Sequence, residues 1–149
     1  MKITLPQYVT LEEVKRVCSK LNIRDWTSLK KPEVSPEEAQ VILAELDTGE
    51  MKVPVESFRE GLEVELEHGI RYHEANVTNN HPTLTGQIVL AHFQESLDYY
   101  KRLEVVEIEG DLLKAVVNKN TAKVEALYRK LVKAKLVLSK TESDLLAQR

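Results

Sequence analysis

Long apolar runs, cysteine pairs and glycine-rich loops are all missing from this 149-residue sequence, which has one cysteine, one tryptophan and five scattered glycines. No apolar run approaches the roughly 18 residues that a membrane-spanning helix needs, so we expect a soluble protein. Cys18 has no partner for an intramolecular disulfide, and the N-terminus shows no charged-then-apolar signal, which indicates a reduced cytoplasmic protein. The isolated glycines argue against a phosphate-binding loop, and no nucleophile or zinc-protease signature occurs. Whether the protein is an enzyme is left open.

Charge is unevenly distributed along the chain, although its net value is only −3. Residues 114–149 carry nine Lys or Arg and three acids, a net charge of +6, so the remaining chain carries −9. A basic segment of this kind binds an acidic partner, or it is a helix solvated by lysines that pairs with the acidic body. We favour the second interpretation. Nucleic acid is disfavoured because Tyr128 is the only aromatic residue among the basic side chains.

Apolar residues recur at helical spacing along most of the chain, and two capping boxes mark helix starts at Thr10/Glu13 and Ser35/Glu38. Gly69 is expected to end the third helix and Gly110 to interrupt the later ones. The expected helices cover about residues 11–21, 36–46, 55–69, 83–107, 112–117 and 124–138. The sequence therefore predicts an all-α fold, a single-domain bundle (residues 1–149) of five or six helices. At most, residues 1–9 and 51–53 add a short strand pair.

The last helical segment has apolar residues at alternating steps of three and four, which is heptad register. These residues are Val124, Leu127, Leu131, Ala134 and Leu138. Two helices that pack as an antiparallel hairpin would use such a seam, and so would one helix that pairs between subunits. Residues 105–149 are therefore predicted to form a helical hairpin or oligomerisation helices, and a homo-oligomer is a candidate state.

All four histidines lie between residues 63 and 100, where two Glu/His pairs have the same spacing in opposite order. A carboxylate and an imidazole three residues apart project from one side of a helix, as in metal sites of helical bundles. Antiparallel helices would bring such reversed pairs together, which predicts a divalent metal site for iron, manganese, zinc or nickel. The predicted ligands are His68, His92 and Glu95, with Glu65 or Glu67 and Asp98 as further carboxylates. The loop residues His73 and His81 are further candidates for this site, although loop histidines are more often simply exposed.

The same residues also fit a protein without metal. Charged helical pairs at this spacing arise often by chance, and they can form a hydrogen-bonded network with Tyr72, Tyr99 and Arg102. One face of the expected helix 83–107 is too apolar for solvent and too polar for a core: Leu84, Ile88, Ala91, His92, Glu95, Tyr99 and Arg102. The alternative function is therefore a non-catalytic interaction or oligomerisation module.

Four phrases occur in order between residues 55 and 104: ELEHG, NVTNNHP, AHFQE and DYYKRL. On these phrases the chain resembles a family of small helical proteins classified as a domain of unknown function. The shared polar positions include His68, His92, Glu95 and Asp98, whereas Asn80 and His81 replace acids of the family pattern. The resemblance implies a helical core region but no activity.

Overall fold

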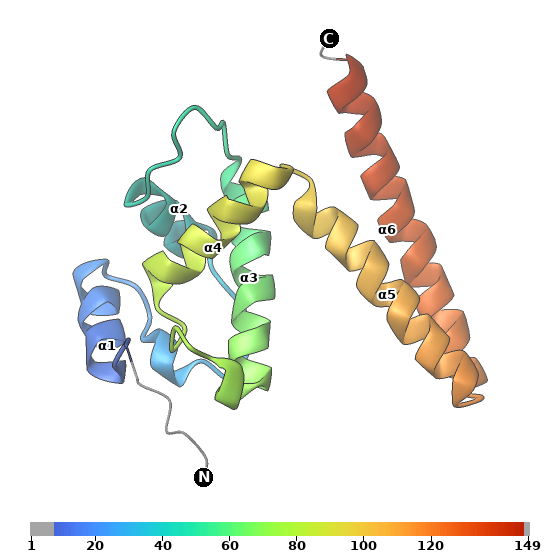
Figure 1. Cartoon of the computed structure of the whole chain (residues 1–149), viewed down its shortest axis with the longest axis horizontal. Helices are drawn as coiled ribbons and strands as arrows, with labels where there is room; N and C mark the ends of the chain where they lie inside the picture. The colour runs from blue at the N-terminus through green and yellow to red at the C-terminus, as the bar shows by residue number, and fades with distance from the viewer. Residues whose placement is uncertain (1–7, 148–149) are drawn as a thin grey trace. The chain divides into compact units, whose positions relative to one another are not determined.

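The computed structural model describes residues 8–147, which form two compact units, here named unit 1 (residues 8–95) and unit 2 (residues 96–147). Unit 1 contains α1 (Leu11–Lys20), η1 (Trp26–Ser28), α2 (Pro36–Ala44), α3 (Val55–Arg71), η2 (His73–Ala75) and α4 (Pro82–Glu95) (Figure 1). Unit 2 contains α5 (Tyr99–Val117) and α6 (Thr121–Ala147). No strand occurs within residues 8–147, so the all-α prediction is confirmed there. Residues 51–53 form no strand, and most of the expected N-terminal strand lies outside the described residues.

Both predicted capping boxes start helices where the sequence places them. The Thr10 hydroxyl accepts a hydrogen bond from the Glu13 amide at 3.2 Å and begins α1. Ser35 and Glu38 cap each other's backbone amides at the start of α2, with Pro36 as the first helical residue. These side chains satisfy amides that have no partner inside the helix, so the helix starts are determined locally.

Glu38 also connects α2 to the preceding loop. Its buried carboxylate accepts hydrogen bonds from Arg24 Nη2 at 2.6 Å and from the Trp26 indole at 3.4 Å. Burial alone would raise the pKa of Glu38, but these donors and the Ser35 amide outweigh burial and hold the pKa below its usual range. The carboxylate is thus a structural anchor for Trp26, which is fully buried.

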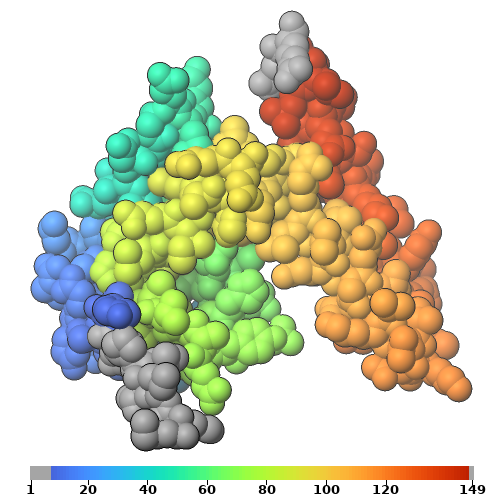
Figure 2. Space-filling view, in the orientation of Figure 1, coloured from blue at the N-terminus to red at the C-terminus, as the bar shows by residue number. Residues whose placement is uncertain are grey.

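The core of unit 1 forms where α2, α3 and α4 meet. Phe58 and Ile42 are completely buried there, and Gly86 of α4 lies so close to them that a Cβ atom would be 3.0 Å from Phe58 Cζ and 2.6 Å from Leu46 Cδ1. In Figure 2, α4 (yellow-green to yellow) lies beside the turquoise segment that follows α2. Close packing at Gly86 therefore sets how near α4 approaches α2 and α3.

Three features of the predicted helices are wrong, each for a local reason. Helix α3 continues past Gly69 to Arg71, because Gly69 serves a close backbone approach instead of a helix end. The expected helix 83–107 is broken after Glu95, where the Ser96 hydroxyl donates to the buried Asp98 carboxylate, and α5 begins at Tyr99. Gly110 lies inside α5, since a helical glycine costs only about 1 kcal/mol, less than the packing of the apolar residues around it contributes.

Glu63 is half-buried and connects α3 to the loop before α2. Its Oε1 atom accepts from the Val34 amide at 3.0 Å and from Arg59 Nη1 at 2.6 Å. This contact could not be expected from helical periodicity, because the Val34 amide lies 29 residues away in the sequence.

In unit 2, α5 and α6 pack as an antiparallel hairpin (Figure 1). The heptad residues predicted on α6 face α5: Leu131 and Ala134 are buried against Val105 and Ile108, and Leu127 and Leu138 pack at the edges. The turn at residues 118–120 includes Lys119 with φ of 53°. Among the described residues, no helix combines the length and apolar character that crossing a membrane requires.

Candidate functional site

Glu65 on α3 and His92 on α4, two of the residues predicted for the metal site, approach each other. The two helices run in roughly opposite directions (Figure 1), and His92 Nε2 lies 3.6 Å from Glu65 Oε1. Both side chains are partly buried, Glu65 more than His92. The structure therefore brings together one imidazole and one carboxylate from the two predicted pairs.

His68 and Glu95 do not join this contact, because the register between the helices differs from the one that the prediction requires. For both pairs to meet, Glu65 would face Glu95 and His68 would face His92. With Glu65 opposite His92, His68 and Glu95 each lie about 4.5 Å further along their own helix, in opposite directions. Both side chains are exposed. Within residues 8–147 no three or more His, Cys, Asp or Glu side chains are grouped to hold a metal ion.

The other two predicted ligands lie elsewhere. Glu67 is exposed on α3, with its Oε1 atom 4.0 Å from Arg71 Nη1. Asp98 belongs to unit 2 and is buried in a network of its own. The structure thus assigns neither residue to the Glu65–His92 contact.

Asp98 is the centre of a polar network at the open end of the hairpin. Arg102 donates from Nε to Asp98 Oδ1 at 3.0 Å and from Nη2 to Oδ2 at 2.7 Å, and the Ser96 hydroxyl donates to the same carboxylate. Arg102 Nη2 also lies 2.9 Å from Glu142 of α6. Burial would raise the pKa of Asp98, but the Arg102 and Ser96 hydrogen bonds hold it below its usual range. The network therefore fastens the start of α5 to the end of α6.

A small cavity of about 110 Å³ borders Glu65 and His68, and the Asn-rich loop forms its opposite wall. Asn79 and Asn80 both have positive φ, 49° and 57°, a conformation that Asn tolerates better than most residues. Asn79 Nδ2 donates to the Val9 carbonyl at 2.6 Å, and a Cβ atom on Gly69 would lie 2.0 Å from Asn80 Oδ1. The asparagines of the NVTNNHP phrase and the glycine of ELEHG are thus explained by loop geometry.

His81 is buried, contrary to the expectation that the loop histidines are exposed; His73 is exposed as expected. The Nδ1 atom of His81 lies 3.4 Å from the Leu84 amide and 3.2 Å from the Thr83 hydroxyl, the position of a cap for α4. Burial lowers the pKa of His81, and accepting from the Leu84 amide requires an unprotonated Nδ1. The sequence contains the signal for this role, because a Pro at the first helical position makes His81 the capping residue.

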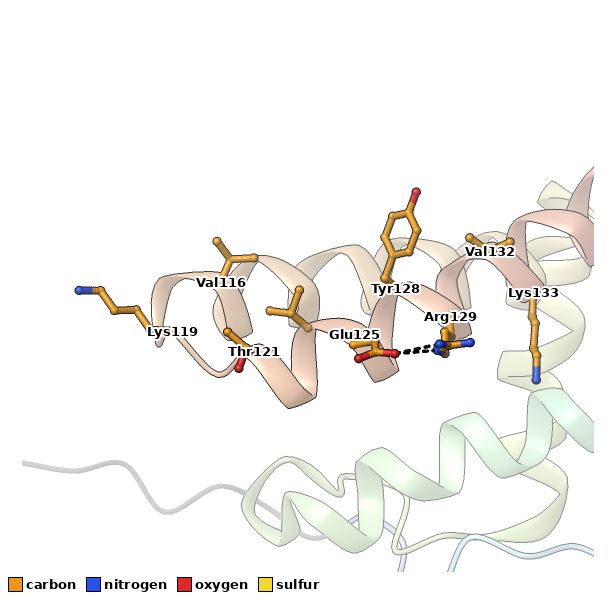
Figure 3. A pocket seen from close by; sticks show the side chains of 9 residues that line it. Val116, Lys119, Thr121, Glu125, Tyr128, Arg129, Val132 and Lys133 are labelled. Atoms are coloured by element: carbon orange, nitrogen blue, oxygen red, sulfur yellow. Dashed lines mark hydrogen bonds and ion pairs between the residues drawn. The ribbon is translucent and has the colours of Figure 1, made fainter.

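The hairpin exposes a second set of apolar side chains beside its packed seam. We name this set the apolar flank: Val106, Leu113 and Val116 of α5, with Tyr128 and Val132 of α6. Each side chain is more than half exposed. Figure 3 shows Val116, Tyr128 and Val132 pointing to the same side, where they line a groove with Glu125 and Arg129. Sequence reasoning missed this flank, although its residues recur at heptad steps just as those of the seam do.

The opposite flank of the hairpin is charged. It carries the Lys130–Glu104 ion pair at 4.0 Å and, at the neighbouring positions of both helices, mostly Lys, Asp and Glu. Val137 is its exposed large apolar side chain. Pairing of Lys130 with an acid of α5 agrees with the interpretation of the basic segment as a solvated helix, and binding of an acidic partner stays a prediction.

Comparison with known proteins places the chain in a family but assigns no activity. Residues 14–109 match the family described as Protein of unknown function (DUF5661), so the chain belongs to that family. The match begins well before residue 55, where the resemblance in the sequence starts, and it includes the whole of unit 1 from the middle of α1. It ends inside α5, and α6 lies beyond it. No curated protein and no solved structure matches this chain.

Proposed function

We propose that this member of the DUF5661 family is a non-catalytic interaction module, and that the apolar flank of the α5–α6 hairpin is its docking surface. The supporting observation is the exposure of Val106, Leu113, Val116, Tyr128 and Val132 on one side of a hairpin whose own seam is already packed. Monomeric proteins rarely leave large contiguous apolar patches in water, and such patches mark interaction sites.

The energetic gain from covering the flank is substantial. Fully burying a Val or Leu side chain that was exposed contributes roughly 1.5–3 kcal/mol, and these side chains are already partly covered. Five side chains at about 1 kcal/mol each give roughly 5 kcal/mol before the cost of association. A partner that covers the whole flank therefore gains more than one that touches a single residue.

The polar network at the open end prepares the hairpin for docking. Arg102 holds the buried Asp98 carboxylate and the Glu142 carboxylate together, so that both ends of the hairpin are tied, one by the turn at residues 118–120 and one by this network. A surface that is ordered before binding loses less conformational entropy when a partner arrives. The network thus supports docking without taking part in chemistry.

A photo-crosslinking residue tests this proposal in the cells from which the protein comes. At Glu125, which borders the groove, it should give discrete covalent adducts. At Lys123, exposed on the charged flank two residues away, it should give few or none. The comparison controls for expression and exposure. Equal adduct patterns at both positions, or no adducts at Glu125, would count against a docking surface on this flank.

Divalent metal binding is a second candidate function, supported by the distance between His92 Nε2 and Glu65 Oε1. Two ligands held about 2.1 Å from one ion in tetrahedral geometry lie roughly 3.4 Å apart, close to the 3.6 Å found here. His68 borders the same cavity as Glu65, and we propose it as the third ligand. Glu95, Glu67 and Asp98 are not required for this smaller site.

Elemental analysis of protein purified without a histidine tag tests the second candidate. Metal binding predicts close to one iron, manganese, zinc or nickel per chain, and loss of that metal in the His92→Ala variant. Glu67→Ala is the matched control, since its carboxylate is exposed and lies away from His92. Stoichiometry far below one in the wild-type protein, unchanged by His92→Ala, would exclude this function.

The free thiol of Cys18 is buried in unit 1, and burial raises its pKa, so it remains protonated and unreactive at neutral pH. A cytoplasmic location, which we propose from the sequence, is compatible with this thiol.

A further inference from the structure

We infer that the partner of the apolar flank is a second copy of this chain, with the two hairpins packed flank to flank as a four-helix bundle. This inference rests on the proposed docking function of the flank and adds the identity of the partner. It concerns unit 2 only, and it requires nothing of the Glu65–His92 contact.

Sequence spacing on both helices supports this arrangement. On α5 positions 106, 109, 113 and 116 follow steps of three, four and three, and on α6 positions 125, 128, 132 and 135 repeat the same steps. Five of these eight positions hold the apolar flank residues, and the other three are Glu109, Glu125 and Lys135. These two series lie beside the seam on the same side of the hairpin, as the ion pair between Glu109 and Lys135 at 2.8 Å confirms. A helix with one apolar seam forms a two-helix pair, whereas a helix in a four-helix bundle presents a second seam next to the first.

Charge on the flank favours a copy of the chain over a strongly acidic or basic partner. Glu109 is paired with Lys135, Arg102 with Glu142 at 2.9 Å and Glu125 with Arg129 at 2.8 Å, so three ion pairs within the hairpin balance charge beside the flank. Lys119 and Lys133 also border the groove. A two-fold symmetric interface places the same patch on both sides, and it must therefore avoid like-charge repulsion. An apolar centre bordered by these ion pairs meets this condition over most of the flank.

The area of the flank reaches the lower bound for a specific dimer interface. Helix α5 has 19 residues and is therefore about 28 Å long. Two helices with axes about 9 Å apart and diameters of about 10 Å present a side roughly 19 Å wide. The projected area is about 500 Å² per copy and about 1,000 Å² per pair, the lower bound for a specific interface. Accessible area exceeds projected area, so the flank lies within the range of weak to standard interfaces.

Sedimentation velocity of the full-length protein tests the inference, with a matched pair of variants. Val132 on the apolar flank and Val137 on the charged flank have exposures of 53% and 51%. The wild-type mass should rise toward twice the 17.0 kDa of one chain with concentration, between about 1 and 100 μM. Val132→Glu should weaken this association at least tenfold, because each copy brings a carboxylate into the apolar centre. Val137→Glu should leave it unchanged.

Each alternative result has a definite meaning. A dimer that Val137→Glu weakens and Val132→Glu does not would overturn the inference, since the wrong flank would then be buried. A wild-type monomer over the whole range would also overturn self-pairing. In that case adducts of Glu125 to a different protein would still support the proposed docking function, so that the two failures are distinguishable. Circular dichroism confirms that each variant keeps its helices, and Val132→Ser, which adds no charge, should show a smaller effect of the same sign.

Discussion

Unit 1 and unit 2 differ in how completely their helices bury apolar residues. In unit 1 three helices meet around Phe58 and Ile42, and a loop with buried polar groups closes one end. Unit 2 has two helices and one seam. Among the described residues, eleven exposed large apolar side chains lie in unit 2 and six in unit 1, although unit 2 is the smaller. Two helices can bury only the residues that face each other, so the apolar flank of the hairpin stays exposed.

The largest expected difference in unfolding free energy is between a substitution in the core of unit 1 and one on the apolar flank of unit 2. Phe58→Ala should lower the free energy of unfolding of unit 1 by about 3–5 kcal/mol, because it leaves a cavity among packed helices. Tyr128→Ala should change the stability of dilute protein by less than about 0.5 kcal/mol, since the ring is mostly exposed. Urea unfolding at low protein concentration measures both. A large loss for Tyr128→Ala would mean that the chain itself covers the flank.

Asp98→Asn should have the next largest effect, and this variant tests whether the polar network holds the hairpin together. The substitution removes a charge that accepts three hydrogen bonds in a buried position, which should cost about 1.5–3 kcal/mol. Hydrogen exchange of the first turn of α5 should accelerate accordingly. Glu142→Gln is the control, because this more exposed carboxylate should contribute far less. Equal effects of the two variants would contradict the central role of Asp98.

Two Gly→Ala substitutions should have opposite signs in the two units. Gly69→Ala should destabilise unit 1 by about 1–3 kcal/mol, because the new Cβ atom would lie 2.0 Å from Asn80 Oδ1. Gly110→Ala should stabilise α5 by about 0.5–1 kcal/mol, because nothing lies within 4 Å and Ala favours helices. Thermal unfolding measures both changes. Tolerance of Ala at position 69 would mean that the Asn-rich loop moves freely.

The smallest expected effect depends on pH and on His81. Burial lowers its pKa in the folded state, so between that value and its usual value of about 6.5 the unfolded chain binds a proton that the folded chain does not. Stability from this cap is therefore present above pH 6.5 and decreases by about 1 kcal/mol as the pH falls below it. His81→Asn keeps a capping acceptor without a titrating group, so its stability should change less between pH 7 and pH 5. If the stability of the wild type and of His81→Asn changed equally with pH, His81 would not contribute to the pH dependence of stability.

Local signals in the sequence were sufficient for the type and start of most helices. The Thr10 and Ser35 caps, and the heptad residues around Leu131, act through neighbours within a few residues or one helical face, so that their roles follow from spacing. The break in the helix after Glu95 could not be predicted from spacing. It depends on the hydrogen bonds that Ser96 and Arg102 donate to the buried Asp98 carboxylate.

In the candidate site, too, one part could be predicted from local sequence spacing and another depends on tertiary packing. The opposite order of the two Glu/His pairs predicts that Glu65 faces Glu95 and His68 faces His92, whereas the structure places Glu65 beside His92. Helix register, however, depends on packing at positions such as Gly86, where the approach to Phe58 and Leu46 leaves no room for a side chain. A shift of one helical turn between α3 and α4 decides whether all four Glu and His side chains meet or only two of them. The spacing of residues within each helix contains no information about that shift.

By itself, the sequence determined the all-α class, the caps of α1 and α2, the seam of the hairpin and the absence of the common catalytic motifs, since each depends on the identity and spacing of nearby residues. Only the tertiary structure decided the Glu65–His92 register, the buried state of His81 and Asp98, and the exposure of the apolar flank. The physical reason is that burial depends on which helices pack together. Val132 and Leu131 are adjacent and apolar, yet one is exposed and the other buried, because only Leu131 faces α5.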